Sequence, residues 1–143
     1  MFFGTYEHSL DEKNRLVVPS RIIKNLIDKR LFIMRGYEGS LSLFPSDEFE
    51  KYLNKLNSFP LESKLSRDVS RLALSSVYEL EIDKANRIQL PTALVNKFAI
   101  SKEVVVLGLG SHIEIWSKSK WNEYLKENED SFEKISEELL KNV

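Results

Sequence analysis

One eleven-residue motif occurs twice in the chain, and this duplication constrains the fold more than any local pattern does. The first copy spans residues 10–20 (LDEKNRLVVPS) and the second spans residues 82–92 (IDKANRIQLPT), an offset of 72 residues. Asp, Asn, Arg and Pro occupy equivalent places in both copies. The correspondence continues without a gap as far as Tyr52-Leu53 and Tyr124-Leu125. Two copies are too few for an open solenoid, so we predict two pseudo-symmetric halves.

The length of the chain favours a single domain over residues 1–143, large enough to bury a core. A hydrophobic content of 42% and a charged content of 30% are ordinary for a globular protein. We place the first repeat at residues 5–53 and the second at residues 77–125. Residues 126–143 then form a C-terminal helix.

Each half has the same predicted order of elements. Asn14 and Asn86 stand where Asn closes a tight turn between two strands. Pro19 and Pro91 end the second strand and open a helix. Alternating apolar residues downstream predict two more strands, which a further helix follows. Residues 108–110 (GLG) are predicted to be a hairpin turn. The predicted fold class is therefore α+β.

Two segments outside the repeats also have helical patterns. Residues 61–77 carry a stripe of apolar residues together with Lys64, Arg67 and Arg71. A solvated helix face explains these cations better than a second DNA-facing patch does. Asp130 and Glu133 resemble a capping box that opens an amphipathic terminal helix. We expect that helix to pack on its own protein or on a neighbouring subunit.

The residues with catalytic or metal-binding chemistry do not form a recognisable site. Asp11 and Asp83 each have an Arg four residues later, which favours a braced anion over a tuned acid or base. His8 and His112 are isolated, and the chain has no cysteine. We predict no catalysis, no cofactor and no metal site. With no signal peptide or membrane-spanning stretch, we also expect a cytoplasmic protein without a membrane partner or a small-molecule substrate.

The repeated motif has a structural and a functional interpretation. On the structural one, Asp11 and Asp83 cap loop amides and brace the hairpins by pairing with arginine. On the functional one, loops that project cations from a sheet enter a DNA groove, where arginine binds guanine or phosphate. The candidate DNA-contacting residues are Lys13, Asn14, Arg15, Lys84, Asn86 and Arg87.

The doubled hairpins, each leading into a helix opened by proline, resemble the MraZ family of bacterial transcription regulators. Residues 1–6 (MFFGTY), 10–15 (LDEKNR) and 112–116 (HIEIW) carry the resemblance, which covers nearly the whole chain. It implies a duplicated swapped-hairpin, AbrB-like β-barrel with flanking helices, assembled into ring-shaped homo-oligomers. It also implies binding to short direct repeats of double-stranded promoter DNA, upstream of the division and cell-wall gene cluster that begins with the regulator's own gene. The expected effect is repression at the nucleoid, and the family's motif arginines fall on Arg15 and Arg87.

This chain departs from the family pattern in its loops. The family often has Gly where Asn14 and Asn86 stand, and Ala85 replaces the cation that Lys13 supplies in the first copy. Residues 5–36 contain seven Lys and Arg against four Asp and Glu, whereas residues 77–108 contain four of each. We therefore expect the second hairpin to bind DNA more weakly than the first.

A ring of identical protomers would place several reading loops along direct repeats, so weak contacts multiply. The alternative is an oligomeric scaffold or an antitoxin-like interaction module without specific DNA binding. Such a protein would tolerate loss of the arginine in the first hairpin, and its binding would not depend on salt.

Overall fold

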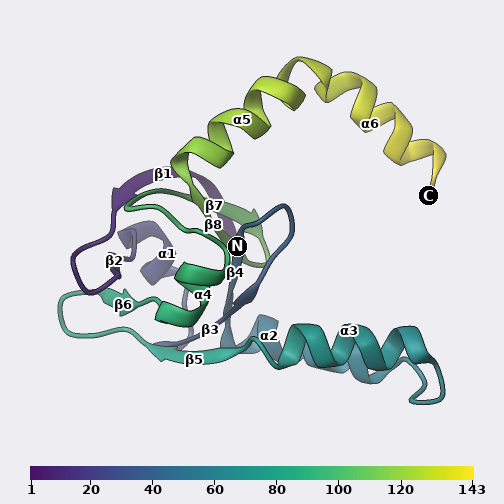
Figure 1. Ribbon diagram of the computed structural model, residues 1–143, viewed down its shortest axis with the longest axis horizontal. Coiled ribbons are helices and arrows are strands. Elements are labelled where there is room, and N and C mark those ends of the chain that lie inside the picture. The colour runs from purple at the N-terminus through teal and green to yellow at the C-terminus, as the bar shows by residue number, and fades with distance from the viewer.

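A computed structural model describes all residues 1–143 and shows an α+β architecture with antiparallel sheets, which confirms the predicted class (Figure 1). The strands are β1 (Phe2–Ser9), β2 (Arg15–Val17), β3 (Arg30–Arg35), β4 (Leu41–Pro45), β5 (Tyr78–Glu81), β6 (Arg87–Gln89), β7 (Glu103–Gly110) and β8 (Ile113–Ser117). The helices are α1 (Ser20–Lys24), α2 (Ser46–Asn57), α3 (Lys64–Leu74), α4 (Thr92–Lys97), α5 (Lys118–Asn128) and α6 (Phe132–Lys141), with a 3-10 turn, η1 (Glu129–Ser131), before α6.

The two halves of the chain are interlocked through their strands. Six strands form one sheet in the order β1-β7-β8-β4-β3-β5, and β2 and β6 form a separate two-stranded sheet. The first strand of each half pairs with the third strand of the other half, β1 with β7 and β5 with β3. The second strands of the halves, β2 and β6, pair with each other. Neither half therefore has a complete sheet of its own.

The swapped-hairpin barrel expected from the resemblance is not confirmed, because the strands do not close into a barrel. The larger sheet ends at two edge strands, β1 and β5. Beyond these strands the chain turns at Asp11 and Asp83 into β2 and β6, which have only three residues each. Pro19 and Pro91 lie shortly after β2 and β6 and have no N–H to donate, so neither strand is prolonged.

Side chains that alternate along the strands build a core on one face of the large sheet. Leu31 and Ile33 of β3, with Ile113 and Ile115 of β8, are fully buried in a cluster of 19 residues. Leu16 of β2 joins the same cluster, because the two-stranded sheet covers this face. The β2–β6 ribbon is therefore held against the core by its inner side chains.

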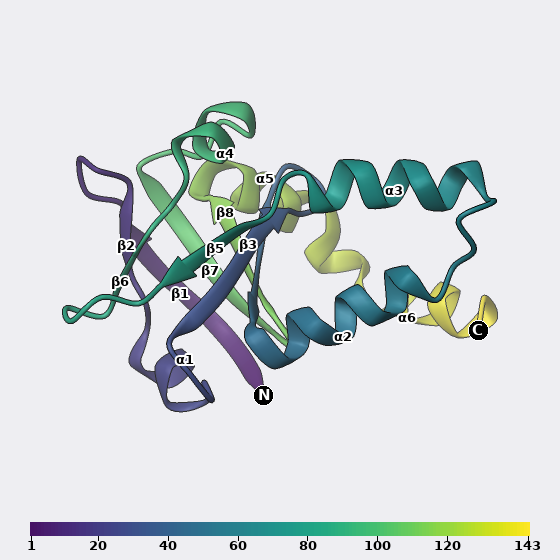
Figure 2. The same cartoon turned by 90° about the horizontal axis from the view of Figure 1, so that it is seen from below.

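The opposite face of the sheet carries α2, α3 and α5, whereas α1 and α4 pack into the main core cluster. Phe32 of β3 stacks on Phe49 of α2 with 4.4 Å between ring centroids, and Trp116 of β8 meets Trp121 of α5 edge-on at 5.3 Å. The α2–α3 pair and the α5–α6 pair extend from the sheet as two separate arms (Figure 1, Figure 2). None of these helices combines the length and the apolar character that crossing a bilayer requires.

Two local predictions are wrong. The Gly108-Leu109-Gly110 segment continues β7 rather than forming the turn, which lies at Ser111-His112. Gly108 is required in the strand because a Cβ atom there would lie 2.4 Å from the backbone nitrogen of Phe3 in β1. Asp130 does not cap the last helix: it lies inside η1, and no side-chain cap hydrogen bond precedes α6.

Candidate nucleic-acid interface

The first motif loop is held by the carboxylate of Asp11. Its Oδ1 accepts hydrogen bonds from the backbone N–H groups of Lys13 and Arg15, each at 2.9 Å. Its Oδ2 accepts from the Nε–H of Arg15 at 2.6 Å. The backbone N–H of Asn14 donates to the Asp11 carbonyl at 3.0 Å and closes the turn.

The second loop repeats this network around Asp83. The carboxylate accepts from the backbone N–H groups of Ala85 and Arg87 at 2.9 Å each and from Arg87 Nε at 3.0 Å. Asn86 N–H donates to the Asp83 carbonyl at 3.0 Å. Asp11 and Asp83 thus accept the same set of hydrogen bonds in their loops, because the same residue spacing recurs.

These hydrogen bonds stabilise the charged form of both aspartates. The backbone N–H of Arg15 is the main reason that the pKa of Asp11 lies below its ordinary value, and partial desolvation opposes this effect. The N–H of Arg87 lowers the pKa of Asp83 in the same way. Both groups are therefore anionic at neutral pH, as structural anchors rather than proton donors.

Left-handed backbone at the two asparagines joins the loops to the ribbon. Asn14 has φ 59° and Asn86 has φ 61°, a region that Asn tolerates better than most residues do. The carbonyl of Asn14 accepts from the N–H of Leu90 at 2.9 Å, and that of Asn86 accepts from the N–H of Val18 at 2.8 Å. Each loop is thereby fixed to the strand of the other half.

The ribbon places both loops in one structure, at its opposite ends. Antiparallel pairing sets Arg15 across from Gln89 and Val17 across from Arg87. Leu16 and Ile88 between them face the core, so the four neighbouring side chains lie on the outer face. From the sequence the two hairpins are separate candidate DNA-contacting elements, whereas in the structure β2 and β6 pair and form one ribbon (Figure 2).

The motif arginines keep most of their hydrogen-bonding capacity free. Each uses its Nε–H on the neighbouring aspartate, and the terminal NH2 groups have no partner in the structure. The guanidinium plane is therefore fixed at one edge while two NH2 groups remain available for phosphate or guanine. Lys13 and Lys84 are exposed in the loops and form no ion pair.

Gln89 is a candidate contact residue that the sequence reasoning did not single out. It lies on the outer face opposite Arg15, and its Nε2 donates to the carbonyl of Lys13 at 3.2 Å. The period-two alternation of β6 carries the signal for it, because Gln89 follows Arg87 by two positions. The equivalent residue of the first copy is the apolar Val17.

The cations of α3 lie away from this ribbon and are engaged locally. Lys64 pairs with Asp68 at 2.7 Å, and Arg67 donates to the carbonyl of Leu61 at 2.7 Å. Figure 2 shows α3 at the opposite end of the molecule from the β2 and β6 loops. Their placement agrees with the solvated helix face that the sequence favours.

The acidic and histidine side chains form no metal-binding cluster. No group of three or more His, Cys, Asp or Glu side chains is arranged to hold a metal ion. His8 lies in β1 opposite Val104, whereas His112 lies in the turn just before β8 and stacks on Phe44. The two histidines therefore lie in different parts of the fold.

Comparison with known proteins identifies the family. The model of a family described as "MraZ protein, putative antitoxin-like" matches the chain twice, over residues 1–72 and 73–143. The chain belongs to the MraZ family. The predicted resemblance is confirmed.

Full-length relatives of the MraZ family carry a functional name. A protein of Oenococcus oeni named Transcriptional regulator MraZ is 40% identical, over 97% of this chain and 96% of its own. Proteins of the same name from Natranaerobius thermophilus and Mesoplasma florum are 39% and 34% identical. The match to the Natranaerobius thermophilus protein covers 98% of this chain and 97% of the relative. The match to the Mesoplasma florum protein covers 100% of this chain and 98% of the relative. The relatives are thus named as transcriptional regulators and not as enzymes.

Proposed function

We propose that this protein is a DNA-binding transcriptional regulator without enzymatic activity. It acts on short direct repeats upstream of its own division and cell-wall gene cluster, as a nucleoid-associated repressor. The supporting observation is the β2–β6 ribbon, in which Arg15 and Arg87 are each fixed through Nε with their terminal NH2 groups unpaired. The name of the relatives supports the same class of function.

The dimensions of the ribbon fit a DNA groove. From Asn14 to Val18 the chain rises about 3.4 Å per residue, which separates the two loops by roughly 14 Å. The major groove of B-DNA is about 12 Å wide and admits a two-stranded ribbon. The outer face of the ribbon enters the groove, where the arginines and Gln89 reach base edges. Lys13 and Lys84 neutralise phosphates at the groove walls.

Exposed apolar faces support assembly into a ring-like homo-oligomer. The α3 face exposes Leu65 and Leu72, and the α6 face exposes Phe132 and Leu139. Contiguous apolar surface of this kind is typical of protein interfaces. Assembly sets several ribbons along one DNA molecule, so modest affinity per ribbon gives high affinity for direct repeats.

The direct test is a binding assay on the DNA upstream of the protein's own gene. Native and repeat-scrambled duplexes are titrated with wild type, Arg15→Ala, Arg87→Ala and the control Lys126→Ala, at several salt concentrations. We expect preference for the native duplex and affinity that falls steeply with salt, because phosphate contacts release counterions. Each arginine variant should lose about 1–3 kcal/mol of that preference. The control, on an exposed face of α5, should bind as wild type does.

The same assay separates this function from the scaffold or antitoxin-like module. Equal affinity for both duplexes, or affinity independent of salt, would refute specific DNA binding. In that case the exposed apolar faces of α3 and α6 would be the functional surface, and the doubled motif would serve folding alone. A larger effect of Arg15→Ala than of Arg87→Ala would support the prediction that the first hairpin dominates.

A further inference from the structure

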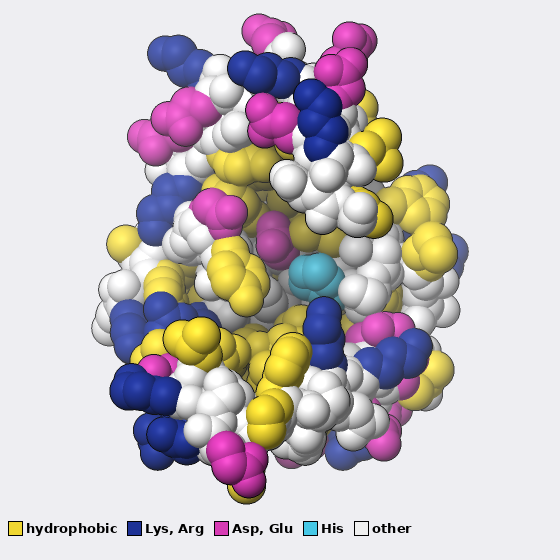
Figure 3. Space-filling model, turned by 90° about the vertical axis from the view of Figure 1, so that its right-hand side faces the viewer, with side chains coloured by type: hydrophobic (Ala, Val, Ile, Leu, Met, Phe, Trp, Pro, Cys, Tyr) yellow, Lys and Arg dark blue, Asp and Glu magenta, His cyan; other side chains and the backbone are white.

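A cavity of about 580 Å³ lies between the α2–α3 arm and the sheet, away from the β2–β6 ribbon. Figure 3 shows the face between the two helical arms, which is hollowed, with a histidine at the base of the hollow and hydrophobic side chains around it. The cavity is lined from β3, β4, α2, α3 and the β7–β8 turn. Its volume falls within the range of about 300–1,000 Å³ that is typical of small-molecule sites.

The floor of the cavity is aromatic. Phe44 of β4 stacks on His112 with 5.1 Å between ring centroids and an interplanar angle of 18°. Its ring also stacks on that of Tyr52 at 5.5 Å. Met34 and Ala73 complete a buried apolar base beside it. A flat apolar group fits this floor because aromatic rings attract one another in offset-stacked geometry.

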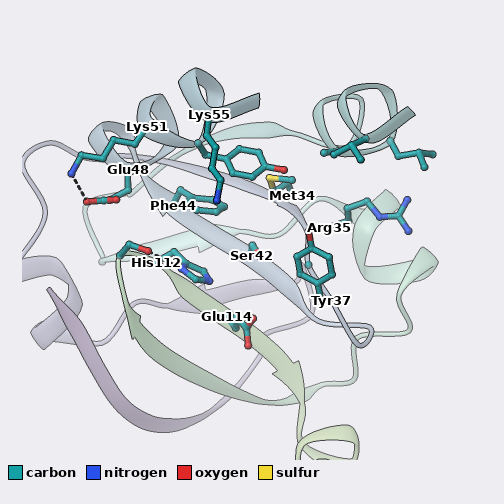
Figure 4. A pocket seen from close by; sticks show the side chains of 16 residues that line it. Met34, Arg35, Tyr37, Ser42, Phe44, Glu48, Lys51, Lys55, His112 and Glu114 are labelled. Carbon is teal, nitrogen blue, oxygen red and sulfur yellow. Dashed lines mark hydrogen bonds and ion pairs between the residues drawn. The ribbon is translucent and has the colours of Figure 1, made fainter. Parts of the chain in front are cut away.

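The carboxylates that line the cavity are already engaged. Glu48 accepts a hydrogen bond from Lys51 at 3.1 Å, at the rim of the cavity (Figure 4). Glu114 accepts from the indole Nε1 of Trp116 at 2.9 Å. The lining carries three cations, Arg35, Lys51 and Lys55, against these two anions, so its net charge favours an anionic ligand.

Some donors of the lining, in contrast, have no partner. Figure 4 shows the ammonium group of Lys55 directed from α2 into the cavity, and this group has no ion-pair or hydrogen-bond partner. The Tyr52 hydroxyl also has no partner, and burial raises its pKa, so it remains a donor at neutral pH. His112 uses Nδ1 on the hydroxyl of Ser111 at 3.1 Å and leaves Nε2 free. Arg35 lies over the ring of Phe98 at 5.3 Å, and Lys51 pairs with Glu48.

We propose that this cavity binds a planar aromatic carboxylate, with its ring against the aromatic floor of Phe44, Tyr52 and His112 and its carboxylate on Lys55. An aromatic floor selects the flat apolar body, and the free cation selects the anionic head. The Tyr52 hydroxyl, which also lines the cavity, supplies a second unpaired donor. None of its residues belongs to the ribbon, although Leu72 of the lining also lies on the α3 face proposed above for assembly.

A matched pair of probes tests the proposal on the full-length protein. Naphthalene-2-carboxylate and naphthalene-2-carboxamide share shape and apolar area and differ in charge. Calorimetric titration should show that the carboxylate binds and that the affinity of the carboxamide is lower by at least about fivefold. Hydrogen bonds to charged groups are stronger than those to neutral groups. Lys55→Gln should lower carboxylate affinity about fivefold and leave the carboxamide unchanged. Lys126→Gln, which removes an exposed cation of α5, should change neither affinity.

The two histidines of the chain provide an internal control for the location of binding. In an NMR spectrum of the histidine rings, the carboxylate should shift the signals of His112 and leave those of His8 unchanged. His112→Gln assigns the signals. Shifts at both residues or at neither would overturn the site, as would equal affinity for the two probes. A third result would also overturn it: Lys55→Gln alters the sedimentation coefficient and not the probe affinity, which would assign the cavity to contact with a second copy of the chain.

Discussion

Replacing both turn asparagines by alanine should destabilise the protein by an amount set by their backbone. Asn14 and Asn86 have φ 59° and 61°, and their side chains form no hydrogen bond, so their contribution is the left-handed conformation itself. Alanine in that conformation costs about 1 kcal/mol at each site. The sites lie at opposite ends of the ribbon, roughly 14 Å apart by strand rise, so the costs should add to about 2 kcal/mol. This corresponds to a Tm that is lower by roughly 8 °C.

Urea unfolding followed by tryptophan fluorescence measures the effect, with all variants at one protein concentration. The matched control replaces both asparagines by glycine, which adopts positive φ without steric cost. The glycine variant should lie within about 1 kcal/mol of wild type because only unfolded-state entropy changes. Alanine variants that unfold at the wild-type urea midpoint, or glycine variants less stable than alanine ones, would refute the reasoning.

The same glycine variants decide whether the asparagines also read bases. The hydrogen-bonded turn survives in glycine, whereas the side-chain amide that would bind adenine is lost. If Asn14→Gly retains preference for the native repeats, the asparagine has only a conformational role.

Three further predictions concern stability. The backbone N–H of Arg15 lowers the pKa of Asp11 below 3.8, so this contribution to stability is present above about pH 4 and is lost as pH falls through the folded-state pKa. Urea midpoints measured from roughly pH 6 to pH 2 should therefore fall less steeply for Asp11→Asn. Gly108→Ala places a methyl group 2.4 Å from the backbone of β1 and should cost about 3 kcal/mol in urea unfolding. Ile115→Ala, at a fully buried site, should cost about 3–4 kcal/mol, whereas the exposed control Ile27→Ala should change stability by less than about 0.5 kcal/mol.

The parts of the site that depend on near neighbours in sequence could be predicted. Asp11 reaches the amides of residues two and four positions later, and the same spacing recurs at Asp83, so a local motif carries the whole network. Positive φ at Asn14 and Asn86 follows from the same motif. The α+β class follows from alternation and helical periodicity, which are also local signals.

Features that depend on contacts between the halves could not be predicted. Gln89 is a candidate contact residue because β6 pairs with β2, and no spacing in the sequence states that pairing. In the sequence Gly108 resembles a turn residue. Only the pairing of β7 with β1, which places Gly4 opposite Gly108, shows that the glycine is needed inside a strand. The cavity beside Phe44 depends on where α3 packs. The pattern of polar and apolar residues in α3 does not predict the part of the sheet against which the helix lies.

The interlocked ribbon presents two copies of one motif with the same backbone and different loop tips. Both loops have the same hydrogen bonds and the same left-handed asparagine, so their backbones are equivalent. Their tips differ, with Glu12-Lys13 in the first loop and Lys84-Ala85 in the second. Because β2 and β6 pair antiparallel, the two loop tips lie at opposite ends of one ribbon, at a fixed separation. On the DNA-binding proposal, this asymmetry gives each protomer a defined polarity on DNA, and direct repeats are the arrangement of sites that suits it. Exchanging residues 12–13 with residues 84–85 should keep stability and invert the orientation preference on a single box, which footprinting with an end-attached cleavage reagent would measure.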